Sequence, residues 1–172
     1  MKVLNVGSAA VGMPAKYSAW DVVRLDIDPG AEPDICLDAR LLTTLEAAQF
    51  DAVYCSHNLE HFYRHEVPGV LEGIKHVLKP GGFVEIHVPD LMAMAKAMTE
   101  PDDVWYESEL GPITFHDVLY GYGQAVATGN THYAHKCGFS ANSLGEAVHR
   151  AGFDKVEVYD GSGNLLSYGV KP

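Results

Sequence analysis

The sequence has few cysteines, little positive charge and no long hydrophobic run. Its cysteines, Cys36, Cys55 and Cys137, form no C-x-x-C pair, and their odd number favours a reducing compartment, the cytoplasm, over a disulfide framework. No apolar run reaches the roughly 18 residues of a membrane-spanning helix. Lys and Arg number 12 against 23 Asp and Glu, for a formal net charge of −11. A surface this acidic repels phosphate backbones, so we expect no nucleic-acid partner. The lack of a long apolar run likewise predicts no membrane partner.

Two phosphate-binding motifs are also missing from the glycine-containing segment near the N-terminus. Gly7 and Gly12 have the spacing of a P-loop. Met13 and Pro14 stand, however, where that loop needs a Lys and a Ser or Thr. The dinucleotide fingerprint G-x-G-x-x-G fails as well, because Ala9 occupies its second glycine position. A nucleotide with phosphates is therefore disfavoured as the ligand, and with it a dehydrogenase.

Short apolar segments alternate with helix-compatible segments from the N-terminus to about residue 89. We expect strands at residues 3–6, 22–25, 34–37, 50–55 and 83–88, and helices at residues 40–49 and 67–78. The segment Pro80-Gly81-Gly82 indicates a turn before the last of these strands. Such alternation predicts an α/β fold with a parallel sheet and helices on its faces.

The pattern changes after Asp90. A helix is expected at residues 91–98, and residues 100–135 are rich in Gly, Tyr and His and are predicted to be irregular. Because long irregular segments are usually functional or mobile, we interpret this one as a lid-like insert in a single domain, 1–172. A helix at 143–151 precedes strands at 156–159 and 165–170, which predict a C-terminal antiparallel hairpin. The edge of that hairpin is a place for a partner chain, such as a second copy in a homodimer.

Small or polar residues follow four of the predicted strands: Gly7, Asp26, Asp38 and the pair Ser56-His57. Because the carboxyl ends of parallel strands meet at one edge of a sheet, we expect these residues to form one ligand site. Asp26 follows Gly7 at about the ~20-residue spacing at which an acid binds ribose hydroxyls. Asp38 can accept a hydrogen bond from an adenine amine. A ribose and an adenine without phosphate describe S-adenosylmethionine.

Two later stretches make the prediction more specific. "FDAVYCSHNLEHF" (50–62) and "VLEGIKHVLKPGGFVEIHVPD" (70–90) resemble the second half of a class I S-adenosylmethionine-dependent methyltransferase. A weaker resemblance extends through "HKCGFSANSLGEAVHRAGFDKVEV" (135–158), and "LNVGS" and "RLDIDP" fit a small bacterial subgroup with an abbreviated first helix. The resemblance implies a Rossmann-like, mostly parallel seven-stranded sheet with helices on both faces. It also implies S-adenosylmethionine as cofactor and a small-molecule acceptor.

The resemblance assigns residues to each part of this cofactor. They are Gly7 and Ser8 beside the methionine part, Asp26 on the ribose, Ile27 against the adenine, Asp38 and Ala39 on the adenine, and Ser56 and His57 near the sulfonium. The chain departs from the family at Asn5, where an acid is usual, and at Ala9, where glycine is common.

The chain contains nine histidines, and some could be metal ligands or bases. His57, His61 and His65 would share one face of a helix, but the segment begins directly after a predicted strand and lacks further ligands, so we expect no metal. Transfer of a methyl group to an alcohol or phenol is helped by a base that titrates near neutral pH. His57, at a strand end, and His135, at the end of the insert, are the candidate catalytic residues. Glu60 and His61 are expected to fasten the loop.

Two functions from different classes fit these observations. In the first, the chain is an enzyme that methylates a small molecule held under the aromatic insert, which contains Trp105, Tyr106, Tyr120, Tyr122 and Tyr133. In the second, it is a catalytically inactive binding or assembly module, because the glycine loop is altered and no dedicated substrate domain is present.

Overall fold

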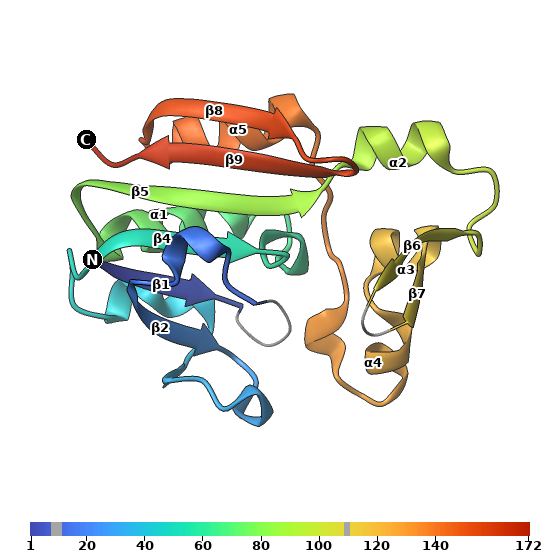
Figure 1. The fold of residues 1–172 in the computed structure, drawn as a ribbon, viewed down its shortest axis with the longest axis horizontal. Helices are drawn as coiled ribbons and strands as arrows, with labels where there is room; N and C mark the ends of the chain where they lie inside the picture. The colour runs from blue at the N-terminus through green and yellow to red at the C-terminus, as the bar shows by residue number, and fades with distance from the viewer. Residues whose placement is uncertain (8–11, 109–110) are drawn as a thin grey trace.

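The computed structural model describes residues 1–7, 12–108 and 111–172, and its centre is a twisted sheet of seven strands (Figure 1). The order of the strands across the sheet is β3-β2-β1-β4-β5-β9-β8. Their bounds are Lys2–Val6 (β1), Asp21–Asp26 (β2), Ile35–Cys36 (β3), Phe50–Ser56 (β4), Leu78–Pro89 (β5), Asp154–Asp160 (β8) and Asn164–Val170 (β9). The strands β1 to β5 are parallel, whereas β9 runs antiparallel to both β5 and β8. The predicted fold class is therefore confirmed, including the C-terminal hairpin.

The central strands are apolar because both of their faces are covered. Val3, Leu4 and Val6 of β1 are completely buried, as expected for an inner strand of a parallel sheet. Strand β5 extends through the Pro80–Gly82 bend, where its pairing with β4 jumps from Leu78 to Phe83. The predicted turn is thus a bulge inside one long strand.

The two faces of the sheet are covered unequally. On one face lie the helix α1 (Val67–Val77), the 3₁₀ helix η3 (Ala39–Thr44) and the helix α5 (Ala141–Arg150), and α1 packs against the other two. On the other face the 3₁₀ turn η1 (Ala15–Tyr17) brings Tyr17, which is only 1% exposed, against β1 and β4. This short turn stands where the sequence indicated an abbreviated first helix.

The helix expected at 40–49 is wrong in type and length. The observed element is η3, which ends at Thr44. Its N-terminus is capped by Asp38, whose side chain accepts a hydrogen bond from the Arg40 amide. Near its end the Thr44 hydroxyl donates to the carbonyl of Leu41. Side chains that bond the local backbone in this way compete with helical hydrogen bonds and shorten the element.

Residues 100–135, which we call the insert, are more regular than the sequence indicated, so that prediction is also wrong. The insert contains the hairpin β6 (Val104–Ser108) and β7 (Gly111–Thr114), the helices α3 (Phe115–Tyr120) and α4 (Gly123–Ala127), and the 3₁₀ turn η5 (Thr131–Tyr133). A capping box starts α3: the Thr114 hydroxyl accepts from the Asp117 amide, and the Asp117 carboxylate accepts from the Thr114 amide.

The insert lies beyond the carboxyl ends of the parallel strands and is reached through the helix α2 (Leu91–Ala97), which the sequence predicted (Figure 1). Both chain termini lie at the opposite end of the sheet. The insert therefore faces the edge of the sheet where the sequence placed a ligand.

In the described ranges, no helix is both long enough and apolar enough to cross a bilayer.

Candidate functional site

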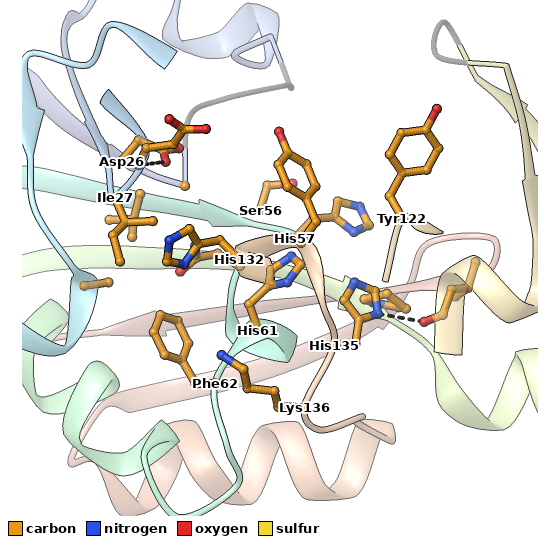
Figure 2. Close-up of a pocket in the computed structure, with 18 of the residues that line it drawn as sticks. Asp26, Ile27, Ser56, His57, His61, Phe62, Tyr122, His132, His135 and Lys136 are labelled. Atoms are coloured by element: carbon orange, nitrogen blue, oxygen red, sulfur yellow. Dashed lines mark hydrogen bonds between the residues drawn. The ribbon is translucent and has the colours of Figure 1, made fainter. Parts of the chain in front are cut away.

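A cavity of about 560 Å³ separates the carboxyl ends of the strands from the insert (Figure 2). Ligand sites for small molecules have volumes of roughly 300–1,000 Å³. The sheet side contributes Gly7, Asp26, Asp38 and Ser56, and the insert side contributes Trp105, Tyr106, Tyr122, His132, Tyr133 and His135. The cavity is thus walled by segments that are far apart in the sequence.

The structure brings the predicted site residues together. Of the residues assigned to the cofactor, these line the cavity: Gly7, Asp26, Ile27, Asp38, Ala39, Ser56 and His57. The remaining one, Ser8, lies outside the described residues. Both candidate catalytic residues, His57 and His135, line the same cavity.

The turn after β1 is built around Gly7. Its backbone has a φ of +75°, and its amide donates to the carbonyl of Leu25 at 2.9 Å. A Cβ at this position would lie 2.5 Å from Nδ2 of Asn58, so only glycine fits here. Asn58 also lines the cavity, and the sequence reasoning missed it because only the fold brings the first and fourth strands side by side.

Asp26 ends β2 and is only 7% exposed. Its Oδ1 accepts a hydrogen bond from the amide of Asp28 at 2.9 Å. This bond fixes the carboxylate in the wall of the cavity. Asp28 in turn accepts a hydrogen bond from Nδ2 of Asn130 at 3.1 Å, which fastens the insert to the end of β2. Asn130 is a second residue that local sequence patterns do not reveal.

Asp38 lines the cavity, caps η3 and pairs with Arg40. Burial opposes ionisation of its carboxyl, but hydrogen bonds from the Arg40 side chain and amide outweigh burial, so the pKa of Asp38 is lowered. Arg40 also donates to Glu66 at 2.7 Å. Asp38 is therefore an anionic acceptor whose orientation is fixed by its neighbours.

A buried acid follows β4. Glu60, in the 3₁₀ turn η4 (Leu59–His61), is 1% exposed, and its Oε1 lies 3.4 Å from Nδ1 of His57. Burial by itself would raise the pKa of Glu60, but the nearby imidazolium of His57, with smaller contributions from the charges of His61 and His135, lowers it. For His57 burial again opposes the charged form, yet Glu60 prevails and the pKa of His57 is raised. His57 adopts a φ of +48°, a strained conformation that often marks functional residues.

The opposite wall carries His135. Its Nδ1 lies 2.8 Å from the carbonyl oxygen of Val118, and its ring packs edge-on against that of His61 at 4.7 Å between centroids. Burial lowers the pKa of His135 below its usual value, although the charge of Glu60 acts in the other direction. His135 is therefore mainly neutral at pH 7, with Nε2 as the ring nitrogen left for a ligand.

The helical histidine face considered from the sequence is not formed. Residues 57–65 contain only the short turn η4, and His65 is exposed and stacks on Tyr63. His57 and His61 still line the cavity, but His65 does not belong to its lining.

The order of the strands, with a cavity beyond the carboxyl ends of the parallel ones, places the fold in the Rossmann-like class. A family model described as "Methyltransferase domain" matches residues 5–158. This chain belongs to that family, and the family predicted from the sequence is confirmed. The same findings support methyl transfer as the reaction and S-adenosylmethionine as the cofactor.

Solved structures with the same fold cover nearly the whole chain. A methyltransferase dependent on S-adenosylmethionine from Archaeoglobus fulgidus is 13% identical, with a TM-score of 0.63 over 99% of this chain and 86% of the other. A 1,6-didemethyltoxoflavin-N1-methyltransferase from Burkholderia thailandensis, solved with its substrate and S-adenosylhomocysteine, is 16% identical, with a TM-score of 0.57 over 98% of this chain and 70% of the other. A search of curated protein sequences finds no significant match. At such low identity the structural likeness shows the fold alone.

Proposed function

We propose that this chain binds S-adenosylmethionine in the cavity and transfers its methyl group to a small-molecule acceptor. The observation that carries the proposal is the gathering of Gly7, Asp26 and His57, from the ends of three different strands, around one cavity of about 560 Å³. The donors and acceptors fit the cofactor, since a carboxylate and a close glycine turn bind a ribose and an amino-acid chain without needing a phosphate site.

Each part of the cofactor has a candidate partner. Asp26 would accept hydrogen bonds from the ribose hydroxyls, with Ile27 against the adenine. Asp38 and Ala39 would hold the adenine edge, and Gly7, with Ser8 beyond the described residues, the methionine part. Ser56 and His57 would lie near the sulfonium. When bound, the cofactor supplies an electrophilic methyl group, and the chain has to align the acceptor with it.

The acceptor side supports a small molecule. The insert walls the cavity with aromatic side chains, among them Trp105 and Tyr122, and aromatic rings pack well on planar or sugar-like ligands. His57 and His135 would contact the acceptor. Each has its Nδ1 near an oxygen of the protein, Glu60 Oε1 for His57 and the Val118 carbonyl for His135, which leaves Nε2 to take or give a proton.

Further expectations about the whole chain belong to the proposal. A single domain 1–172 is supported by the shared cavity, because sheet and insert both contribute walls. Cys36, Cys55 and Cys137 are free thiols, which supports the cytoplasm as the location. A bacterial source is proposed from the resemblance of the N-terminal motifs to a bacterial subgroup. The outer strand β8, at the edge of the sheet, is the proposed contact for a second copy in a homodimer.

Calorimetric titration with S-adenosylmethionine and S-adenosylhomocysteine tests the proposal. We expect one site per chain with a micromolar dissociation constant. The absence of heat at millimolar ligand, in a sample whose circular dichroism shows a folded protein, would overturn the proposal and favour the inactive binding module.

A further inference from the structure

The buried carboxylate of Glu60 lacks the partners that its burial demands. The residue is 1% exposed, and within the described part of the chain no group donates a hydrogen bond to Oε1 or Oε2. His57 lies at ion-pair distance from one oxygen only. Buried carboxylates that are not hydrogen-bonded are costly, and native proteins normally pair them with cations or metal ions.

Two imidazoles meet this carboxylate. One ligand atom each of Glu60, His61 and His135 can be chosen so that all lie within 4.8 Å of one another. Ligand atoms bound tetrahedrally to one zinc ion at about 2.1 Å are separated by roughly 3.4 Å. Side-chain shifts of less than about 1 Å would therefore bring the three groups onto one cation.

Both histidines are held in the tautomer that binds metals. Nδ1 of His61 lies 3.2 Å from the carbonyl oxygen of Ala134, and Nδ1 of His135 lies 2.8 Å from that of Val118. A carbonyl oxygen only accepts, so each Nδ1 carries the proton and donates it. Each Nε2 then keeps its lone pair. Metal-binding histidines are typically oriented in this way by a backbone carbonyl at the other nitrogen.

The cluster joins the two walls of the cavity. Glu60 and His61 belong to η4, directly after β4, whereas His135 ends the insert. His61 and His135 both line the cavity (Figure 2), so a cation held by them would have open coordination positions toward the ligand space.

We infer that Glu60, His61 and His135 form a site for a divalent transition-metal cation, such as Zn²⁺ or Mn²⁺. Two imidazoles and one carboxylate favour such ions over Mg²⁺ and Ca²⁺, which prefer oxygen ligands alone. A three-ligand set leaves room for an exchangeable ligand, as catalytic metal sites do. The site differs from the 57–61–65 set considered from the sequence, because the third ligand comes from the insert.

The site also narrows the class of acceptor, and this part rests on the proposed function. A hydroxyl or phenol oxygen bound to the cation becomes more acidic. Its proton would pass to solvent water, the oxygen would form the new O–CH₃ bond as the S–CH₃ bond breaks, and a neutral thioether would leave. In this arrangement His135 would act as a metal ligand.

The test is titration of the full-length, EDTA-stripped protein with ZnCl₂ and, separately, MnCl₂ by calorimetry. We expect one site per chain with a micromolar or lower dissociation constant for Zn²⁺, and binding of Mg²⁺, added as MgCl₂, that is at least 100-fold weaker. His61→Ala and His135→Ala should each weaken Zn²⁺ binding at least 10-fold. His65→Ala, which removes an exposed histidine of the same segment, is the matched control. Co²⁺ in place of Zn²⁺ adds a visible absorption band that both site variants should lose.

Unchanged Zn²⁺ affinity in folded His61→Ala and His135→Ala, or no stoichiometric binding at millimolar Zn²⁺, would overturn the inference. The two site variants lie on different segments, so failure of one to fold leaves the other as the test. Titration of S-adenosylmethionine in the presence of EDTA separates this result from the proposed function. Cofactor binding without metal binding would refute only the metal site, and metal binding without cofactor binding only the methyl transfer.

Discussion

At the scale of single residues, Asp26 is the side chain on which cofactor affinity should depend most. Asp26→Asn keeps the oxygen that accepts from the Asp28 amide but removes the charge and one acceptor for the ribose hydroxyls. We expect the dissociation constant for S-adenosylmethionine to rise 10- to 100-fold, about 1.5–3 kcal/mol for a hydrogen bond to a charged group. Calorimetry measures the change.

Asp34→Asn is the matched control for Asp26. Asp34 is an exposed acid near the same edge of the sheet, and its carboxylate accepts from the Arg24 amide outside the cavity. Asp34→Asn should leave the dissociation constant for S-adenosylmethionine unchanged. Equal constants for the Asp26 variant and the wild type would remove Asp26 from the site.

Gly7 offers a second test at this scale. Gly7→Ala forces a side chain onto a backbone with φ of +75° and places its Cβ 2.5 Å from Nδ2 of Asn58. Gly81 has the same φ of +75° but open space around it. Gly81→Ala should therefore cost only the roughly 1–2 kcal/mol of a left-handed backbone conformation in an L residue, whereas Gly7→Ala should cost more and also weaken cofactor binding. Urea unfolding and calorimetry measure both effects, and equal losses in the two variants would contradict the close packing.

The acids and glycine at the strand ends could be predicted from the sequence, but Asn58 and Asn130 could not. Asp26 and Gly7 directly follow apolar runs, and such spacing can be recognised in the sequence alone. Asn130 bonds to Asp28 across 102 positions of the chain, and no local pattern encodes a contact that depends on where the insert folds back.

At the scale of elements, the order of the insert depends on the close contact between the segment after α3 and the segment after η5. Gly121, after α3, has a φ of +98°, and a Cβ there would lie 1.9 Å from the carbonyl oxygen of Tyr133. The neighbouring amide of His135 donates to the carbonyl of Tyr120 at 3.0 Å. Gly121→Ala must therefore push the segments apart and displace His135. We expect faster proteolytic cleavage between residues 100 and 135, detected by mass spectrometry, with little change in the unfolding midpoint of the sheet.

Gly129→Ala is the matched control for the insert. Gly129 also has a left-handed φ, +96°, but nothing lies near its missing Cβ. Its cleavage rate should stay close to that of the wild type. Similar cleavage of both variants would show that backbone strain, rather than the contact between Gly121 and Tyr133, controls the order of the insert.

Elements with long hydrophobic periodicity could be predicted, and short ones could not. The helix expected at 67–78 corresponds to α1, because its apolar stripe has no competing signal. The elements of the insert could not be predicted, because its strands and helices have only four to six residues, too few for a hydrophobic period to show. The Thr114 and Asp117 capping box was the one local signal for a helix there.

At the scale of the whole molecule, the sheet order could be expected from chain connectivity. The unequal covering of the two faces, in contrast, leaves a buried polar cluster around Glu85 that no sequence pattern indicates. On the face without long helices, Glu85 of β5 is 7% exposed. It accepts a hydrogen bond from the Tyr17 hydroxyl at 2.9 Å and lies 2.9 Å from Nε2 of His87. Lys16 of η1 forms an ion pair with the same carboxylate. This cluster fastens η1 to the centre of the sheet in place of a first helix.

The cluster predicts how stability depends on pH. Burial alone would raise the pKa of Glu85, but hydrogen bonds from His87, Lys16 and Tyr17 outweigh it and lower the pKa to about 2, from an ordinary value of 4.5. A lowered folded-state pKa means that the stabilisation is complete above about pH 4.5 and is lost as the pH falls toward 2. The shift corresponds to roughly 3 kcal/mol.

Glu85→Gln removes this contribution while preserving the size of the side chain. We expect the variant to be less stable than the wild type by roughly 2–3 kcal/mol at pH 7, because Lys16 loses its partner and the Tyr17 hydroxyl a charged acceptor. The difference should shrink steadily below pH 4.5, as the wild-type carboxylate takes up a proton. Urea unfolding at intervals from pH 7 to pH 3 measures it. Glu72→Gln, an exposed acid of α1, should stay within about 0.5 kcal/mol of the wild type throughout. A Glu85→Gln deficit that is the same at pH 3 as at pH 7 would show that packing, and not the charge of Glu85, holds η1 on the sheet.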